Sequence, residues 1–443
     1  MKNRSGVIAV VVALVVLVAV LGAGAFVIAS SQPSATGAQS TSAQTQIAQS
    51  DSASDAAQST HRNKLEGATE TTDANGVVHG TSASGVNYVV YGRGEASADA
   101  SKVTFSAVGD SLGTDNSMPI AQRYASSSGG YDFTPFYQEI GPVVQAYDLR
   151  FINQETVMAG TDDGRTYSGY PVFNSPDAML DAIAAEKFNI VNFGSNHTWD
   201  MGSYGIERTQ SLFAEHPEIM LVGSYTSADD RSTVHMIERN GTTFAVLSYL
   251  YGDNSYAEES DFPNTYYSCP FNKETMATEI ARAKEVADAV IVYMHWGSEY
   301  VSEPNEQQTD YAQFLADQEV DLVIGSHAHI TQPAKYVTGA SGKKTLVVYG
   351  LSDFLSGWTL TDTILSGLFT CDFVWEGNEL TVENPVWHPL IEWSDGGDVY
   401  IRLLENMTDD EINANTRTDD VSNDVEYLHE ALNSMGFEIP LAW

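Results

Sequence analysis

Short apolar runs alternate with amphipathic segments along most of the chain, and several apolar runs end directly in an acid, an amide or a histidine. Residues 103–108 are followed by Gly109-Asp110, and residues 289–294 are followed by His295. Strand-like runs that alternate with helical patterns predict an α/β sheet architecture. In open α/β sheets, ligands bind at the carboxyl ends of the strands. The polar residues at these ends are therefore the first candidates for a functional site.

The pattern predicts individual elements. We expect strands over residues 103–108, 149–152, 189–193, 219–222, 289–294, 322–324, 345–349, 368–375 and 380–387. We expect helices over residues 176–187, 205–215, 273–286, 305–318 and 425–435. The dipeptide Asn240-Gly241 between residues 234–237 and 243–249 predicts a β-hairpin.

Five of the predicted strands end in residues that can bind a metal ion. These residues are Asp110, Glu155, Asn196 with His197, His295, and His327 with His329. Taken alone, Asp110 also fits a turn and Asn196 a helix cap. The pair His327 and His329 is more informative, because two imidazoles that flank one residue point the same way on an extended backbone. Such a pair is costly in an apolar core and natural around a cation.

This set of side chains suits a particular chemistry. Carboxylate, amide and imidazole ligands without a thiolate favour Mn²⁺, Fe or Zn²⁺. Two such ions can activate a water and neutralise a phosphoryl group, and a nearby histidine can protonate the leaving oxygen. The residues alone do not separate hydrolysis of a phosphoester from hydrolysis of an amide.

Several short motifs in this order resemble the CapA family of poly-γ-glutamate capsule synthesis proteins, which have a calcineurin-like metallophosphatase fold. The motifs are Gly109-Asp110, Asn153-Gln154-Glu155, Asn196-His197-Thr198-Trp199-Asp200, His295-Trp296-Gly297 and Gly325-Ser326-His327-Ala328-His329. Tyr349-Gly350-Leu351-Ser352-Asp353-Phe354 resembles the closing motif of that family, with Asp353 in place of an asparagine. The resemblance covers about residues 102–392.

The resemblance implies a four-layer αββα sandwich that holds two divalent metal ions. One ion would be bound by Asp110, Glu155 and His329. The other would be bound by Glu155, Asn196, His295 and His327. His197 would act as the acid catalyst with Asp200 as its partner, and Glu299 and Asn153 would contribute to substrate binding. The chain departs from the wider phosphoesterase superfamily at Leu112, where the first motif of that superfamily has a histidine.

The N-terminal residues predict an anchor outside this body. Residues 7–29 are Val, Ala, Leu, Ile, Gly and one Phe, and Lys2 and Arg4 precede them. This pattern predicts a transmembrane helix over residues 7–29, with residues 1–6 in the cytoplasm and the rest of the chain extracellular. A cleaved signal peptide is the alternative. We expect a Ser/Ala/Thr/Gln-rich linker over 30–100, the metallophosphatase domain over 101–395 and a C-terminal extension over 396–443.

Charge and family resemblance narrow the expected partners. The chain has 21 Lys+Arg and 59 Asp+Glu, a net charge of −38, which argues against a nucleic-acid partner. The resemblance implies a role in capsule polymer biosynthesis, with synthase subunits as partners and an anionic polymer or a phosphorylated compound as substrate. The alternatives are a surface metallophosphoesterase that acts on a phosphorylated envelope compound and a non-catalytic accessory subunit of a polymer synthase or exporter. Cys269 and Cys371 can form one disulfide outside the cytoplasm, but their sequence separation does not show whether they meet.

Overall fold

The computed structural model describes residues 64–96, 99, 101–256, 262–417 and 425–443, which all belong to one compact unit. The predicted transmembrane segment at 7–29 and the first part of the predicted linker lie outside these residues. Within the described ranges, none of the helices combines the length and the apolar character that a membrane span needs.

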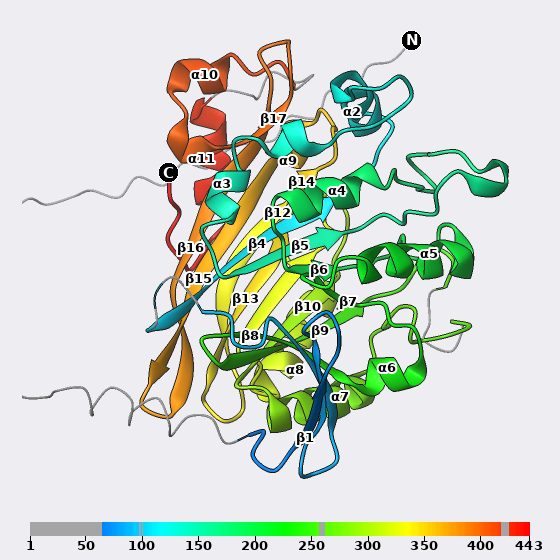
Figure 1. Cartoon of the computed structure of the whole chain (residues 1–443). Coiled ribbons are helices and arrows are strands. Elements are labelled where there is room, and N and C mark those ends of the chain that lie inside the picture. Colours follow the sequence, from blue (N-terminus) through cyan, green and yellow to red (C-terminus); the bar gives the residue numbers. More distant parts are fainter. Residues whose placement is uncertain (1–63, 97–98, 100, 257–261, 418–424) are drawn as a thin grey trace, which may run out of the picture. The chain divides into compact units, whose positions relative to one another are not determined.

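Two β-sheets form the centre of this unit (Figure 1). The nine-stranded sheet has the order β1 (Thr69–Thr72), β2 (Val78–Thr81), β3 (Asn87–Tyr91), β8 (Val234–Arg239), β9 (Thr242–Leu250), β10 (Ala289–His295), β11 (Leu322–Ser326), β13 (Lys344–Leu351) and β12 (Thr331–Thr338). Seven strands of the eight-stranded sheet have the order β17 (Tyr400–Leu403), β16 (Glu379–Trp393), β15 (Leu365–Glu376), β4 (Lys102–Ser111), β5 (Leu149–Gln154), β6 (Ile190–Asn192) and β7 (Met220–Val222). The eighth strand, β14 (Asp353–Leu355), lies off this path and pairs with β4.

Helices surround the sheets. They are α2 (Ser117–Tyr124), α3 (Gly141–Val144), α4 (Ala178–Ala185), α5 (Gly202–Ala214), α6 (Ala228–Ser232), α7 (Lys273–Val286), α8 (Glu306–Asp317), α9 (Thr361–Ile364), α10 (Asp409–Asn413) and α11 (Val425–Ser434). Two of the longer helices begin with side-chain caps. Asn272 accepts backbone N–H groups at the start of α7, and Asn305 forms a capping box at the start of α8.

Alternating side chains of the strands build separate core layers. In β10, Val290 and Val292 pack in one apolar cluster with Ile280 of α7 and Leu315 of α8, whereas Ile291 packs in a second cluster. That second cluster also contains Phe105 of β4 and Phe151 of β5, so it lies between the two sheets. A third cluster packs α2 and α4 on the other face of β4, β5 and β6. Successive residues of a strand point to opposite faces, so these contacts give helix, sheet, sheet and helix layers.

The predicted α/β class is confirmed, and the predicted strands and helices between residues 103 and 387 are present. The hairpin at Asn240-Gly241 joins β8 to β9, and both of these turn residues have positive φ. The predicted helix near residues 425–435 is α11.

The folded body extends beyond the predicted limits of 101 and 395. Strand β3 pairs in parallel with β8, and Val86, Tyr88 and Val90 are buried in the cluster under α7. The part of the predicted linker from residue 64 onward therefore belongs to the nine-stranded sheet. At the other end, β17 pairs with β16 and Ile439 packs between the sheets, so the predicted C-terminal extension is an integral part of the unit.

Cys269 and Cys371 are both buried and both free. Cys269 lies in the cluster under α7, and Cys371 lies in the cluster between the sheets. The structure therefore does not contain the disulfide that the sequence left open.

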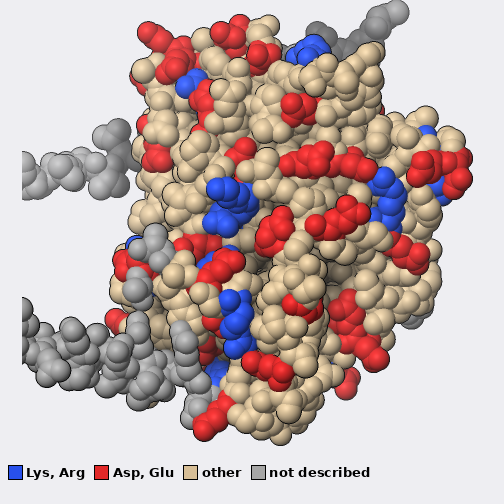
Figure 2. Space-filling model, in the orientation of Figure 1, with Lys and Arg blue, Asp and Glu red and all other residues tan. Residues whose placement is uncertain are grey.

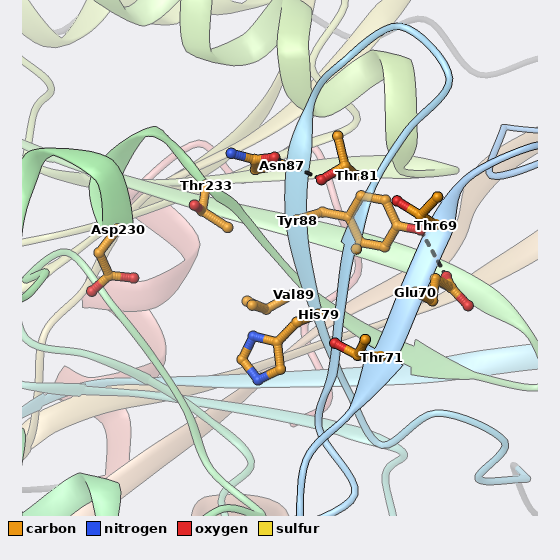
Figure 3. A pocket seen from close by; sticks show the side chains of 11 residues that line it. Thr69, Glu70, Thr71, His79, Thr81, Asn87, Tyr88, Val89, Asp230 and Thr233 are labelled. Carbon is orange, nitrogen blue, oxygen red and sulfur yellow. Dashed lines mark hydrogen bonds between the residues drawn. The ribbon is translucent and has the colours of Figure 1, made fainter.

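The first three strands and α6 enclose a hollow of about 480 Å³ (Figure 3). Tyr88 of β3 donates a hydrogen bond of 2.7 Å to Glu70 of β1, across β2. Arg93 then bridges Glu70 and Glu238 with ion pairs of 2.8 and 3.0 Å. These contacts attach β1 and β3 to β8.

Asp230 in α6 provides a pH test of the contact between α6 and β8. Burial alone would raise the pKa of Asp230, but hydrogen bonds from His235 at 3.1 Å and from Thr226 at 2.9 Å lower it to about 2. Because the folded-state pKa lies below that of the unfolded chain, the carboxylate stabilises the fold above about pH 4 and loses this effect as the pH falls toward 2.

We therefore expect Asp230→Asn to lower the free energy of unfolding by about 1–3 kcal/mol at pH 7. The difference from the unsubstituted chain should shrink as the pH falls from 4 to 3, which denaturant titrations at each pH can measure. A constant difference over this range would contradict the assignment.

Candidate metal centre

The predicted site residues come together where the strands of both sheets end. Asp110 is near the end of β4, Glu155 follows β5, and His295 ends β10. Asn196 and His197 follow β6, while His327 and His329 follow β11. All of these side chains are buried. Parallel pairing explains the meeting, because it sets Asp110 opposite Asn153 and His295 opposite Ser326.

Asp110 is fixed by donors on both carboxylate oxygens. Asn153 donates to Oδ1 at 2.6 Å, and Ser326 donates to the same oxygen. The backbone N–H of His327 donates to Oδ2 at 3.2 Å. Gly109 precedes this residue because a Cβ there would overlap the carbonyl oxygen of Ser352. Asp110 thus joins the strand ends of both sheets.

Asn153 has a different place from the predicted one. Its amide donates to Asp110, and its carbonyl oxygen accepts a 2.6 Å hydrogen bond from Asn192. Because the amide is engaged at both ends and fully buried, this side chain supports Asp110. The prediction that Asn153 binds substrate is not supported by this geometry.

Glu155 is the central carboxylate of the site. Neither of its buried oxygens has a hydrogen-bond partner among the described residues. Its Oε1 lies 3.9 Å from His295 Nε2 and 3.9 Å from His329 Nε2. Burial, followed by the negative charges of Asp110 and Asp353, raises the pKa of Glu155 well above its ordinary value. A cation at this place would offset both effects.

His327 and His329 differ from the sequence expectation in their backbone. They have φ values of +96° and +57°, so the segment is not extended as the sequence analysis assumed. The two rings still face the same centre, with centroids 5.9 Å apart. Left-handed backbone at residues other than glycine is uncommon and is concentrated at functional sites. His327 Nδ1 is buried and has no hydrogen-bond partner in the described part of the chain.

His295 and Asn196 form the opposite side of the centre. His295 Nε2 lies 2.8 Å from Asn196 Oδ1, and its Nδ1 lies 2.9 Å from the hydroxyl of Tyr293. Burial, together with the charges of His327 and His329, lowers the pKa of His295 well below its ordinary value. The ring is therefore neutral at pH 7, as a metal ligand must be.

His197 stands beside this centre, held from several directions. Its Nδ1 lies 2.8 Å from Asp200 Oδ2, and the ring of Phe173 meets it edge-on at 4.5 Å. Asn254 Nδ2 lies 3.2 Å from Nδ1 and 3.4 Å from Nε2. Asp200 also accepts the backbone N–H of Phe173 at 2.7 Å. The predicted pairing of His197 with Asp200 is present. The contact with Asn254 was not predicted, because Asn254 belongs to no sequence motif.

Asp353 is the second residue that the sequence analysis did not assign to the site. Strand β14 pairs in parallel with β4 and sets Asp353 opposite Asp110. Its Oδ1 lies 2.8 Å from His329 Nδ1. Although burial alone would lower the pKa of His329, Asp353 raises it to about 9.

The rim of the site is aromatic and acidic. Tyr251 packs on His327 at 4.6 Å, Trp358 meets His329 edge-on at 5.1 Å, and Tyr300 lies 6.0 Å from His329. Glu299, a predicted substrate contact, is exposed next to Tyr300. A groove of about 490 Å³ runs from Tyr300 to α11. The groove thus shares Tyr300 with the aromatic rim.

The donor set fits a divalent transition metal. Glu155, His327 and His329 offer ligand atoms that all lie within 4.8 Å of one another, and so do Asp110, His329 and Asp353. Unpartnered, fully buried polar atoms are rare in folded proteins. Carboxylate and imidazole donors match the ions that the sequence predicts.

Comparison with known proteins assigns a family. Residues 104–358, more than half of the chain, match the family model described as bacterial capsule synthesis protein PGA_cap. The PGA biosynthesis protein CapA of Bacillus subtilis is 29% identical over 177 residues, which are 39% of this chain and 44% of that protein. The capsule biosynthesis protein CapA of Bacillus anthracis is 25% identical over 269 residues, which are 59% of this chain and 62% of that protein.

Solved structures share a more distant likeness. The calcineurin-like phosphoesterase YfkN from Bacillus subtilis has a TM-score of 0.38 and 13% identity, with 75% of this chain and 97% of that chain covered. A putative 5'-nucleotidase from Staphylococcus aureus has a TM-score of 0.39 and 15% identity, with 75% and 58% covered. The family match does not depend on these structures. The chain belongs to the PGA_cap family of bacterial capsule synthesis proteins.

Proposed function

We propose that this protein is a membrane-anchored extracellular enzyme of capsule polymer biosynthesis, and that it hydrolyses a phosphoester in a metal-dependent reaction. The observation that carries the proposal is Glu155, a fully buried carboxylate between His295 and His329 whose two oxygens have no hydrogen-bond partner among the residues described. The family match supports the biological setting. The anchor at residues 7–29 and the extracellular location rest on the sequence pattern alone.

The proposed ligands are drawn from the strand ends of both sheets. They are Asp110, Glu155 and His329 for one ion, and Glu155, Asn196, His295 and His327 for a second. A bound divalent ion supplies Lewis-acid stabilisation of a phosphoryl oxygen and lowers the pKa of a bound water. Asn153 and Ser326 hold the Asp110 carboxylate in place for this task.

His197 is the proposed acid catalyst. The contact of its Nδ1 with Asp200 leaves Nε2 as the nitrogen that can pass a proton to a leaving oxygen. Phe173 and Asn254 restrict the ring on its other sides. A fixed ring reduces the reorganisation that the proton transfer requires.

The substrate is proposed to be anionic and phosphorylated, such as a capsule polymer or its carrier. A protein with a net charge of −38 repels such a compound. On the face shown in Figure 2, acidic side chains are spread widely and basic ones form a few small groups. Cations at the buried centre would provide the attraction that this surface lacks. The same surface argues against a nucleic-acid partner.

An accessory role without catalysis is the second candidate, and Leu112 favours it. Leu112 is buried where the wider superfamily places a metal-binding histidine. In this reading the protein assists a polymer synthase or exporter and uses its metal centre for structure alone.

The metal centre can be tested with Glu155→Gln. Without metal, this variant should unfold at the same or a higher temperature than the unsubstituted chain, because a neutral amide costs less to bury than an unpaired carboxylate. Added Mn²⁺ or Zn²⁺ at about 100 times its dissociation constant should stabilise the unsubstituted chain by about 2.7 kcal/mol and the variant far less. Thermal unfolding with and without the ion measures both effects.

Glu238→Gln is the matched control, because Glu238 is also buried but pairs with Arg93 at 3.0 Å. This control should lose stability without metal and keep the full stabilisation by the ion. Equal stabilisation of Glu155→Gln and the unsubstituted chain would refute a metal centre at Glu155.

Catalysis can be tested with His197→Ala. We expect the full chain with Mn²⁺ to hydrolyse a generic phosphodiester, and the variant to lose about 10²–10⁴-fold in kcat, the usual contribution of a general acid. The variant should still bind the ion. Half-buried His216, which pairs with Glu218, is the control, and His216→Ala should retain full turnover. If the ion binds but His197→Ala turns over as fast as the unsubstituted chain, the accessory role is favoured.

A further inference from the structure

His329 belongs to two groups of potential ligands at once. With Glu155 and His327 it forms the first group, and with Asp110 and Asp353 it forms the second. The ring reaches them through different atoms. Its Nε2 lies 3.9 Å from Glu155 Oε1, and its Nδ1 lies 2.8 Å from Asp353 Oδ1.

When His329 binds a cation its ring is neutral, and only one of its nitrogens can face the cation because the other carries a proton. One of the groups therefore holds a cation through His329, and the other holds the ring proton. The hydrogen bonds of the neighbouring atoms decide between them.

Most of the second group is satisfied by hydrogen bonds, and among the residues that the structure describes only Asp353 Oδ2 in this group has no partner. Both oxygens of Asp110 accept from donors, namely Asn153 and Ser326 on Oδ1 and the His327 N–H on Oδ2. An ionised carboxylate only accepts, so the 2.8 Å contact with Asp353 places the proton on His329 Nδ1.

The first group has the opposite character. Both Glu155 oxygens and His327 Nδ1 are buried without a hydrogen-bond partner among the residues that the structure describes. These three atoms therefore have neither a hydrogen-bond donor nor a cation beside them. A cation at this group satisfies them, whereas a cation at the second group would displace the short contact between His329 and Asp353.

The backbone holds Asp353 rigidly for this contact. Strand β14 pairs with β4, and the carbonyl oxygen of Ser352 accepts the N–H of Asp110 at 3.0 Å. Ser352 has a φ of +64°, and its hydroxyl donates to the carbonyl oxygen of His329 at 3.1 Å. The same short segment thus fixes both the main chain of His329 and the carboxylate against its ring.

We propose that Asp353 is a positioning residue, which holds the Nδ1 proton of His329 and so presents Nε2 of that ring to a cation bound by Glu155. The inference rests on the proposed metal centre but not on catalysis. A carboxylate behind a ligating histidine fixes the ring and increases its basicity, and loss of such a partner typically weakens metal binding about 10–100-fold.

The test measures Zn²⁺ affinity of the full chain by competition with a fluorescent chelator. We expect Asp353→Ala to bind Zn²⁺ about 10–100-fold more weakly than the unsubstituted chain. Asp353→Asn should fall between the two, because its amide oxygen accepts the same hydrogen bond without the charge. Asp230→Asn, which removes the carboxylate from the remote His235 pair, should leave the affinity unchanged.

A second readout follows the proton itself. With Zn²⁺ bound, ¹⁵N-labelled histidine spectra should show His329 protonated at Nδ1 in the unsubstituted chain. This signal should be lost or shifted in Asp353→Ala, while the His235 signal stays in place. A purely structural role of Asp353 would not move the His329 signal selectively.

The outcomes separate the inference from the proposed function. If the unsubstituted chain binds no Zn²⁺, the proposed metal centre fails and the inference falls with it. If Asp353→Asn and Asp353→Ala bind Zn²⁺ as tightly as the unsubstituted chain does, Asp353 does not position His329, although the metal centre stands. Fewer bound ions at saturation in these variants would make Asp353 a ligand and overturn the positioning role. If Asp353→Ala does not fold, the nearly isosteric Asp353→Asn decides.

Discussion

The arrangement of the site depends on one buried carboxylate. Glu155 follows β5, both of its oxygens are buried, and no donor in the ranges that the structure describes reaches them. Placing a lone ionised carboxylate in such surroundings is costly, and proteins normally compensate for it with a proton, a counter-charge or a metal ion. The rings of His295 and His329 stand 3.9 Å away on two sides. The neighbouring groups are thus placed to share a cation with Glu155.

The two sheets make this placement possible. Strands β4, β5 and β6 in one sheet and β9, β10 and β11 in the other end at the same place, because the apolar layer between the sheets holds them together. Asp110 then ties the two sheets through Ser326 and the His327 N–H. Rigid strands therefore carry the ligands, while the rim is formed by loops that bear Tyr300 and Trp358.

The sequence was most informative where a pattern is local. Strand length and the polar residue after each strand sufficed to predict β4, β5, β10 and β11 and the polar residues that meet at their ends. Neighbouring residues also predicted the contact of His197 with Asp200, three residues apart. Residues 64–96 were harder, because Gly and Ser surround their strands, and their burial depends on α7, which lies about two hundred residues away in the chain.

Contacts between distant segments could not be predicted in this way. Asp353 meets His329 only because β14 pairs with β4, which no spacing in the sequence indicates. Asn254 reaches His197 from a loop without a motif. The prediction of an extended backbone at His327 and His329 was also wrong, because their left-handed conformation depends on the donors and acceptors that surround this segment.

The most direct test of the account is anomalous X-ray scattering from crystals of the full chain grown with Mn²⁺ or Zn²⁺. The account predicts an anomalous peak within coordination distance of a Glu155 carboxylate oxygen and the rings of His327 and His329. A map without a peak there, in which ordered waters instead satisfy Glu155, would contradict it.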